Sequence, residues 1–127
     1  QQKGRSRQGE YSVIEVEIPI KTVSEANMRE HWAVKAERAR VQRGWASFKV
    51  RNARAKDRHL YKLPLAIKFV RIGVRSLDSD NLQSSMKAIR DGVAEALGIN
   101  DGDTRITWDY QQEKGKEYAV KIRIEQL

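Results

Sequence analysis

The sequence predicts an α+β fold, a small mixed sheet of about four strands with helices packed on one face. Two observations predict it. Four short segments are either apolar throughout or alternate apolar and polar residues, as buried and half-buried strands do. Two longer segments repeat apolar residues at helical spacing. The resulting order, β-α-β-α-β-β, is typical of one sheet with helices on one side. At 127 residues, one domain is expected.

The first half of the chain predicts a tail, a strand and a long helix. Residues 1–10 are polar and predict a disordered tail before a domain at 11–127. Residues 11–20 alternate as a half-buried strand. Ser24 is a candidate cap for a helix over 26–55, bent or broken near Gly44. Its apolar positions fall in two offset stripes, Met28, Trp32, Ala36 and Ala39, then Val41, Trp45 and Phe48.

The second half predicts three strands and a shorter helix. Residues 65–72 are apolar enough to lie inside a sheet, and residues 105–110 and 117–124 alternate as strands joined by a hairpin at 113–116. A helix over 81–97 is predicted to begin with an Asp80–Gln83 capping box and to end at Gly98. Its core stripe consists of Leu82, Met86, Ile89, Val93 and Leu97.

Composition excludes several classes of protein. The chain contains no cysteine, which excludes a disulfide scaffold and a zinc site with thiolate ligands, and favours a cytoplasmic location. No apolar run approaches the roughly 20 residues of a membrane span, and no signal-peptide core is present. We therefore expect no membrane partner.

Charge indicates an anionic partner, with nucleic acid as the first candidate. The formal net charge is +8, and residues 29–58 contain ten basic side chains against three acidic ones. Residues 71–103 instead contain four basic and six acidic side chains. The candidate nucleic-acid-binding residues are Arg38, Arg40, Arg43, Arg51, Arg54 and Arg75.

Two pairs of aspartates bracket the second predicted helix. Asp78 and Asp80 precede it, and Asp101 and Asp103 follow it. Ordinary turn and cap chemistry explains Asp80 and the loop that contains Asp101 and Asp103, but it does not explain Asp78. Like charges this close repel unless a cation or a proton intervenes. Carboxylates on a basic protein are what a metal-dependent nuclease needs, because the carboxylates hold the cation and the basic residues hold the phosphates.

Other reactive or aromatic side chains have simpler interpretations. His31 is interpreted as a helix-face residue and His59 as a loop residue, since neither has metal-ligand spacing. Core packing is the default expectation for the three tryptophans, Trp32, Trp45 and Trp108. Lys87 and Asp91 form an ordinary i,i+4 pair on the charged face of the second helix.

The acidic segment resembles the RusA family of Holliday junction resolvases. Members carry D-x-D-N-L, then a lysine, an aspartate four residues later, and a D-D or D-x-D pair opening a strand. The chain shows Asp78, Asp80, Asn81 and Leu82, then Lys87 and Asp91, then Asp101 and Asp103. Ser84 stands where the family has its lysine, and Lys87 follows three residues later. The upstream residues Asn27, Arg29, His31 and Trp32 match less specifically.

This resemblance implies a magnesium-dependent endonuclease of phage or prophage type, which cuts four-way DNA junctions in recombination and repair. It implies a RusA-like fold, a homodimer, and a catalytic set of Asp78, Asp80, Lys87 and one of Asp101 or Asp103. The aspartates in this set would be the metal ligands. Strand register favours Asp103 as the third ligand, whereas adjacency to the helix favours Asp101.

We also expect the second helices to lie near the centre of the homodimer, with Gly92 allowing close approach. Two other functions stay open: a non-catalytic module that binds branched or duplex DNA, and a small scaffolding protein whose basic helix binds an acidic partner.

Overall fold

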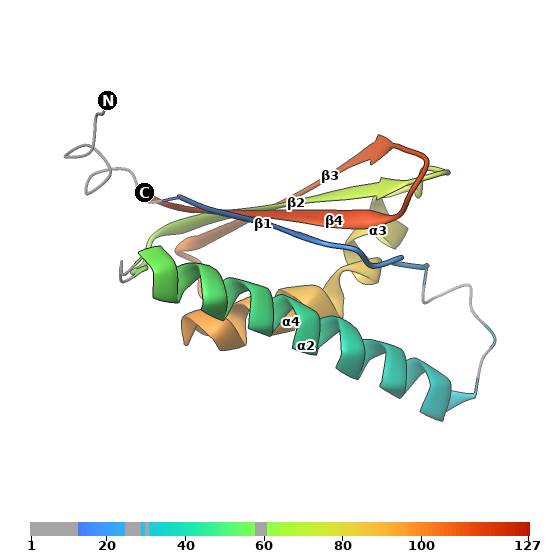
Figure 1. The fold of residues 1–127 in the computed structure, drawn as a ribbon, viewed down its shortest axis with the longest axis horizontal. Helices are drawn as coiled ribbons and strands as arrows, with labels where there is room; N and C mark the ends of the chain where they lie inside the picture. Colours follow the sequence, from blue (N-terminus) through green and yellow to red (C-terminus); the bar gives the residue numbers. More distant parts are fainter. Residues whose placement is uncertain (1–12, 25–28, 30, 58–60) are drawn as a thin grey trace.

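The computed structural model describes residues 13–24, 29, 31–57 and 61–127. A four-stranded sheet forms one layer, and helices lie against one of its faces (Figure 1). The elements are β1 (Val13–Ile18), α2 (Trp32–Asp57), β2 (Leu65–Gly73), α3 (Ser79–Ser85), α4 (Lys87–Leu97), β3 (Ile106–Lys114) and β4 (Ala119–Gln126). The predicted α+β fold with a small mixed sheet is confirmed. The predicted tail lies outside the described residues.

The strand order is β1-β4-β2-β3. β2 pairs in parallel with β3 and antiparallel with β4, whose other side pairs antiparallel with β1. The predicted hairpin between the last two strands is therefore wrong, because β2 lies between them. The connection passes the end of β2, where the Gly115 amide donates to the Gly73 carbonyl at 2.9 Å.

The core lies between the sheet and the two longer helices. Phe69 and Leu65 of β2 are fully buried there, as are Ile122 and Ile124 of β4. All five residues of the stripe predicted for the second helix are also buried, namely Leu82, Met86, Ile89, Val93 and Leu97. That prediction is confirmed. No helix in the described part of the chain is long and apolar enough to cross a membrane.

The long helix α2 differs from its prediction at its start and at Gly44. It begins at Trp32 and continues unbroken through Gly44 to Asp57. The residue before it, His31, accepts a hydrogen bond at Nδ1 from the Ala33 amide at 3.1 Å, so its imidazole caps the helix. The predicted start near residue 26 is wrong for this helix, because Arg29 and His31 are not helical, and the buried Ser24 hydroxyl makes no hydrogen bond to the described residues that would cap it. Residues 25–28 and 30 lie outside the described part.

The single helix predicted over 81–97 is divided at Met86, whose backbone has φ −100° and ψ 2°. Immediately before the break, two serine hydroxyls donate to carbonyls three residues back, Ser84 to Asn81 at 3.2 Å and Ser85 to Leu82 at 2.7 Å. Such bonds compete with the helical ladder, which accounts for the break. The predicted end is confirmed, because Gly98 adopts φ +68° and the Ile99 amide donates to the Ala94 carbonyl.

Gly92 marks the closest contact between α2 and α4. A Cβ atom at Gly92 would lie 2.4 Å from the Arg43 carbonyl oxygen and 2.9 Å from the Ala46 Cβ. Glycine therefore lets the two helix backbones touch within one chain. The close approach predicted for Gly92 exists, but it gives no support to a helix contact between two copies.

Candidate functional site

Asp78 and Asp80 lie where the chain leaves β2 and enters α3. Asp78 is the N-cap residue, and its backbone carbonyl accepts from the Leu82 amide at 2.8 Å. Its carboxylate accepts from the Asn81 side-chain amide at 3.0 Å but makes no capping bond. Asp80 lies inside the first turn, so the predicted capping box with Gln83 is wrong. Both carboxylates are exposed, and among the described residues neither forms an ion pair.

A glutamine on β3 holds the residue just before Asp78. The Gln112 side chain accepts from the Leu77 amide at 2.9 Å and donates to the Leu77 carbonyl at 2.6 Å. This two-point contact fixes the backbone from which Asp78 projects. Sequence reasoning missed Gln112, because an amide within a strand carries no signal of a distant backbone partner.

A buried arginine holds the other end of the same loop. Arg71 lies at an inward position of β2 and donates to the Arg75 carbonyl at 2.7 Å and to the Thr22 hydroxyl at 3.0 Å. Burial lowers the pKa of its guanidinium, partly offset by Tyr118. The loop between β2 and α3 is thus anchored by Arg71 and by Gln112. The available signal for Arg71 was its position, since it continues the inward alternation of Ile67 and Phe69.

Asp101 and Asp103 are both engaged by arginines. Arg90 of α4 donates to the Asp101 carbonyl at 2.8 Å and lies 3.3 Å from its carboxylate. The same guanidinium stacks over Trp108, 4.2 Å from the ring centroid. The carboxylate of Asp103 accepts from Arg105, and this hydrogen bonding lowers the pKa of Asp103 to about 2.

The two aspartate pairs lie toward opposite ends of β3. Asp103 precedes the first residue of that strand, whereas Leu77, next to Asp78, contacts Gln112 near its end. Six residues of strand at about 3.3 Å each separate these points by about 20 Å. Within the described part of the chain, no three acidic, histidine or cysteine side chains are placed to hold one metal ion.

Lys87 is the first residue of α4, and its ammonium lies 3.6 Å from the Asp91 carboxylate. The i,i+4 pair expected from the sequence is therefore present. Among the described residues, Lys87 therefore pairs with Asp91 and with none of the four aspartates that bracket the helix. His59 lies outside the described residues.

Most of the predicted DNA-binding arginines project from α2. Arg40 pairs with Glu37, and Arg51 lies 3.7 Å from Glu95 of α4. Arg43 is exposed beside them, and a hollow of about 450 Å³ lies among these side chains. Arg54 instead donates to the Ala96 carbonyl at 2.9 Å and so holds the end of α4. Two further candidates, Arg38 and Arg75, are half-buried and exposed respectively.

The aromatic residues of α2 lie on its outer surface. Trp32 is 73% exposed and Trp45 39%, so the core packing predicted for these two tryptophans is wrong, and Phe48 of the second apolar stripe is 58% exposed. The buried face of α2 consists of Gln42, Ala46 and Val50. Trp108 is half-buried and stacks on Phe69 at 5.8 Å, which agrees with its predicted packing.

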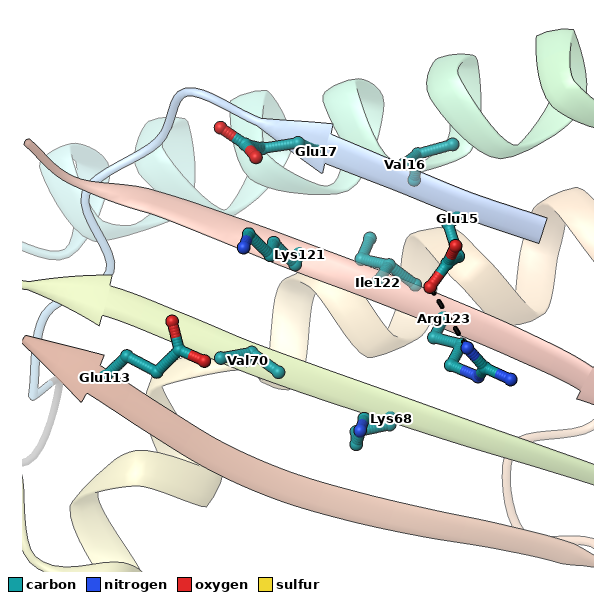
Figure 2. Close-up of a pocket in the computed structure, with 9 residues that line it drawn as sticks. All are labelled: Glu15, Val16, Glu17, Lys68, Val70, Glu113, Lys121, Ile122 and Arg123. Carbon is teal, nitrogen blue, oxygen red and sulfur yellow. Dashed lines mark hydrogen bonds and ion pairs between the residues drawn. The ribbon is translucent and has the colours of Figure 1, made fainter. Parts of the chain in front are cut away.

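The sheet face that the helices leave bare carries charged side chains of both signs (Figure 2). Glu15 and Arg123, directly opposite each other on β1 and β4, form a hydrogen-bonded pair at 3.1 Å. By strand alternation the face carries five carboxylates, Glu15, Glu17, Asp109, Glu113 and Glu125, against three basic groups, Lys68, Lys121 and Arg123. Among the described residues, α2 on the helical side contains eight basic and two acidic side chains, so that side is the more basic of the two.

Comparisons with known proteins add little. No protein-family model and no curated protein matches the sequence. Among solved structures, the chain is similar to 2C-methyl-D-erythritol 2,4-cyclodiphosphate synthase from Plasmodium vivax, with 14% identity and a TM-score of 0.32. The match covers 65% of this chain and 52% of the other, so the chain spans about half of the synthase. At that TM-score the similarity carries no argument about fold or function.

Proposed function

We propose that this chain is a RusA-like, magnesium-dependent endonuclease that cuts four-way DNA junctions as a homodimer. One observation supports this most: Asp78 and Asp80 are exposed, two residues apart, and without a basic partner among the described residues, in a chain of net charge +8. Acidic side chains on a basic protein gain ion pairs easily, as Asp101 and Asp103 do here. An unpaired carboxylate pair suits a site that receives a cation.

The two carboxylates fit magnesium. This ion commonly takes one or two protein carboxylates and completes its shell with waters and substrate phosphate oxygens. When bound, it would supply a water of lowered pKa and neutralise charge at the scissile phosphate. The residues of this chain would position the metal ligands, since Gln112 and Arg71 hold the loop from which Asp78 projects.

The exposed arginines of α2 would hold the DNA backbone. Arg40, Arg43 and Arg51 project from the helical side, and the opposite sheet face carries an acidic excess. Phosphates are attracted to the first surface and repelled by the second. The DNA would therefore approach the helical side.

A homodimer would also account for the separated aspartates. The two pairs lie toward opposite ends of β3, where Ile106, which follows Asp103, and Gln112, which contacts Leu77 beside Asp78, are about 20 Å apart at about 3.3 Å per residue. One chain cannot bring both to a single ion without rearrangement. A two-fold partner offers its own second pair, and two symmetric sites suit a junction that requires two cuts.

Incubation of the protein with a labelled four-way junction, with and without magnesium, tests this function. We expect paired nicks only with magnesium, and little cutting of a linear duplex of the same sequences. Binding without cutting at any magnesium concentration would contradict the proposal.

The second candidate is a non-catalytic module that binds branched or duplex DNA. One observation favours it: Asp101 and Asp103 each pair with an arginine. Among the described residues, this leaves Asp78 and Asp80 as the two predicted metal ligands without a basic partner. It shares the α2 surface and predicts the same salt-dependent binding. Cleavage alone separates the two candidates.

A further inference from the structure

A groove of about 460 Å³ opens between α2 and the α3–α4 pair. The helices touch at Gly92 and Arg43, and the break at Met86 separates α3 from α4 at the other end of the groove. Three alanines, Ala36, Ala39 and Ala88, line its walls. The volume falls in the range of small-molecule sites, and small side chains leave room for a flat ring.

Gln42 lines this groove and is only 4% exposed. Its side-chain nitrogen is buried and has no acceptor among the described residues. A buried donor without a partner is costly, and most buried polar groups in proteins avoid that state. If the Gln42 amide turned toward the groove, an occupant with a carbonyl oxygen or a ring nitrogen would satisfy it.

Charged groups stand around the same groove. Lys35 and Lys87 contribute ammonium groups, and the Lys87 side chain is 76% exposed. Asp91, which pairs with Lys87, contributes a carboxylate acceptor. The groove therefore combines a buried amide donor, an acceptor, apolar walls and two cations.

We propose that this groove binds a nucleotide. The base enters between the alanine walls and accepts a hydrogen bond from Gln42, and its phosphate contacts Lys35 and Lys87. Asp91 accepts from an amino group of the base. The nucleotide is either free or an unpaired nucleotide of DNA, and the DNA form rests on the proposed function. A second copy of this chain is a poorer occupant, because each copy carries a net charge of +8.

The first test titrates the full chain with the four deoxynucleoside monophosphates and the matching nucleosides, in EDTA, by calorimetry and amide NMR. We expect at least one nucleotide to bind, more tightly than its nucleoside, and to shift the Gln42 side-chain amide. Gln42→Met keeps the volume but removes the donor, and should weaken nucleotide binding about tenfold. Its melting temperature should stay equal or rise, because an unpaired buried donor is lost. Gln83→Met, on the exposed surface of α3, is the matched control.

The second test compares a fully paired four-way junction with one that carries a single unpaired 2-aminopurine nucleotide, again in EDTA. Tighter binding of the second junction, lost in Gln42→Met, identifies DNA as the source. Nucleotide binding without that preference identifies free nucleotide.

No binding by nucleotides and no junction preference would overturn the proposal, as would self-association that Ala88→Leu abolishes while nucleotide binding is unaffected. Because both tests omit magnesium, their failure is distinguishable from a failure of cleavage.

Discussion

The two aspartate pairs differ in their hydrogen-bond partners, and single residues explain the difference. Asp103 gains hydrogen bonds from the side chain and backbone amide of Arg105, whereas the Asp78 carboxylate receives, from the described part of the chain, only the Asn81 side-chain amide. Spacing in the sequence predicted that the pairs lie at the two ends of the helical segment. Asp78, Asp101 and Asp103 do lie outside the helices, but Asp80 lies in the first turn of α3. It did not predict the arginine partners, because Arg90 and Arg105 take their positions from the packing of α4 against Trp108 and from the turn before β3.

The Arg105 contact predicts a pH dependence. Hydrogen bonding by Arg105 lowers the pKa of Asp103 from 3.8 to about 2. Because the folded pKa lies below the unfolded one, the pair stabilises the fold above pH 4 or so, and this contribution is lost as pH falls toward 2. Arg105→Gln should return the pKa of Asp103 toward 3.8, as measured by carboxyl NMR titration. Arg123→Gln, on the bare sheet face, should leave it unchanged, and an unaltered value in both variants would refute the contact.

At the scale of elements, apolar periodicity predicted the inner face of α4 and failed for α2. The core stripe of α4 is made of large apolar residues, so it is visible in the sequence. The inner face of α2 contains Ala46, because the touching backbones at Gly92 leave room there only for a small side chain, and it contains the polar Gln42, which interrupts the apolar pattern. Trp45 and Phe48 dominate the pattern but face outward. Nor does periodicity reveal the serine hydroxyls that break the second helix before Met86.

The contact between α2 and α4 predicts opposite effects for two glycines. Gly92→Ala should lower the free energy of unfolding by about 1–2 kcal/mol, because its Cβ would meet the Arg43 backbone and overpacking outweighs the gain in helix propensity. Gly44→Ala meets nothing within 4 Å and should raise it by about 1 kcal/mol. Urea denaturation measures both. A stabilising Gly92→Ala would show that the helices are not in contact there.

Charge on α2 predicts the salt dependence of DNA binding. Reversing Arg40, Arg43 and Arg51 to glutamate should weaken junction binding and flatten the plot of log affinity against log salt by about 0.9 per lost phosphate contact. Fluorescence anisotropy at several salt concentrations measures the slope. Lys68→Glu with Lys121→Glu, on the sheet face of Figure 2, should change the slope little. If the sheet variants flattened it instead, the DNA would lie on the other side.

At the scale of the whole molecule, the sequence predicted the fold class but not the strand order. Alternation identifies a strand and its inner face, yet it does not say which strands are neighbours. β4 is an inner strand that pairs with β1 on one side and with β2 on the other, and its Val120 and Ile122 are fully buried under the helices. The short 115–118 connection therefore joins strands that are not paired. The same topology places the two aspartate pairs toward opposite ends of β3.

That separation predicts sharing of sites between two copies. An Asp78→Asn chain mixed with an Asp101→Asn/Asp103→Asn chain should regain single-strand nicking if the sites are shared, because the heterodimer then contains one intact site. Each variant alone should be inactive. A mixture that stays inactive would place each site within one chain. Sedimentation that shows only monomers at the assay concentration would exclude the homodimer.

The proposed function depends on Asp78 and Asp80 holding the magnesium ion that cleavage requires. Its most direct test compares Asp78→Asn, Asp80→Asn and the wild type for magnesium-dependent nicking and for binding of one four-way junction. Asparagine caps a helix nearly as well as aspartate, so folding should be preserved. We predict that both variants lose cleavage and bind the junction equally or more tightly, since a charge that repels phosphate is removed. Asp109→Asn, exposed on the sheet face, should cut normally. Full cleavage by either variant would contradict the claim.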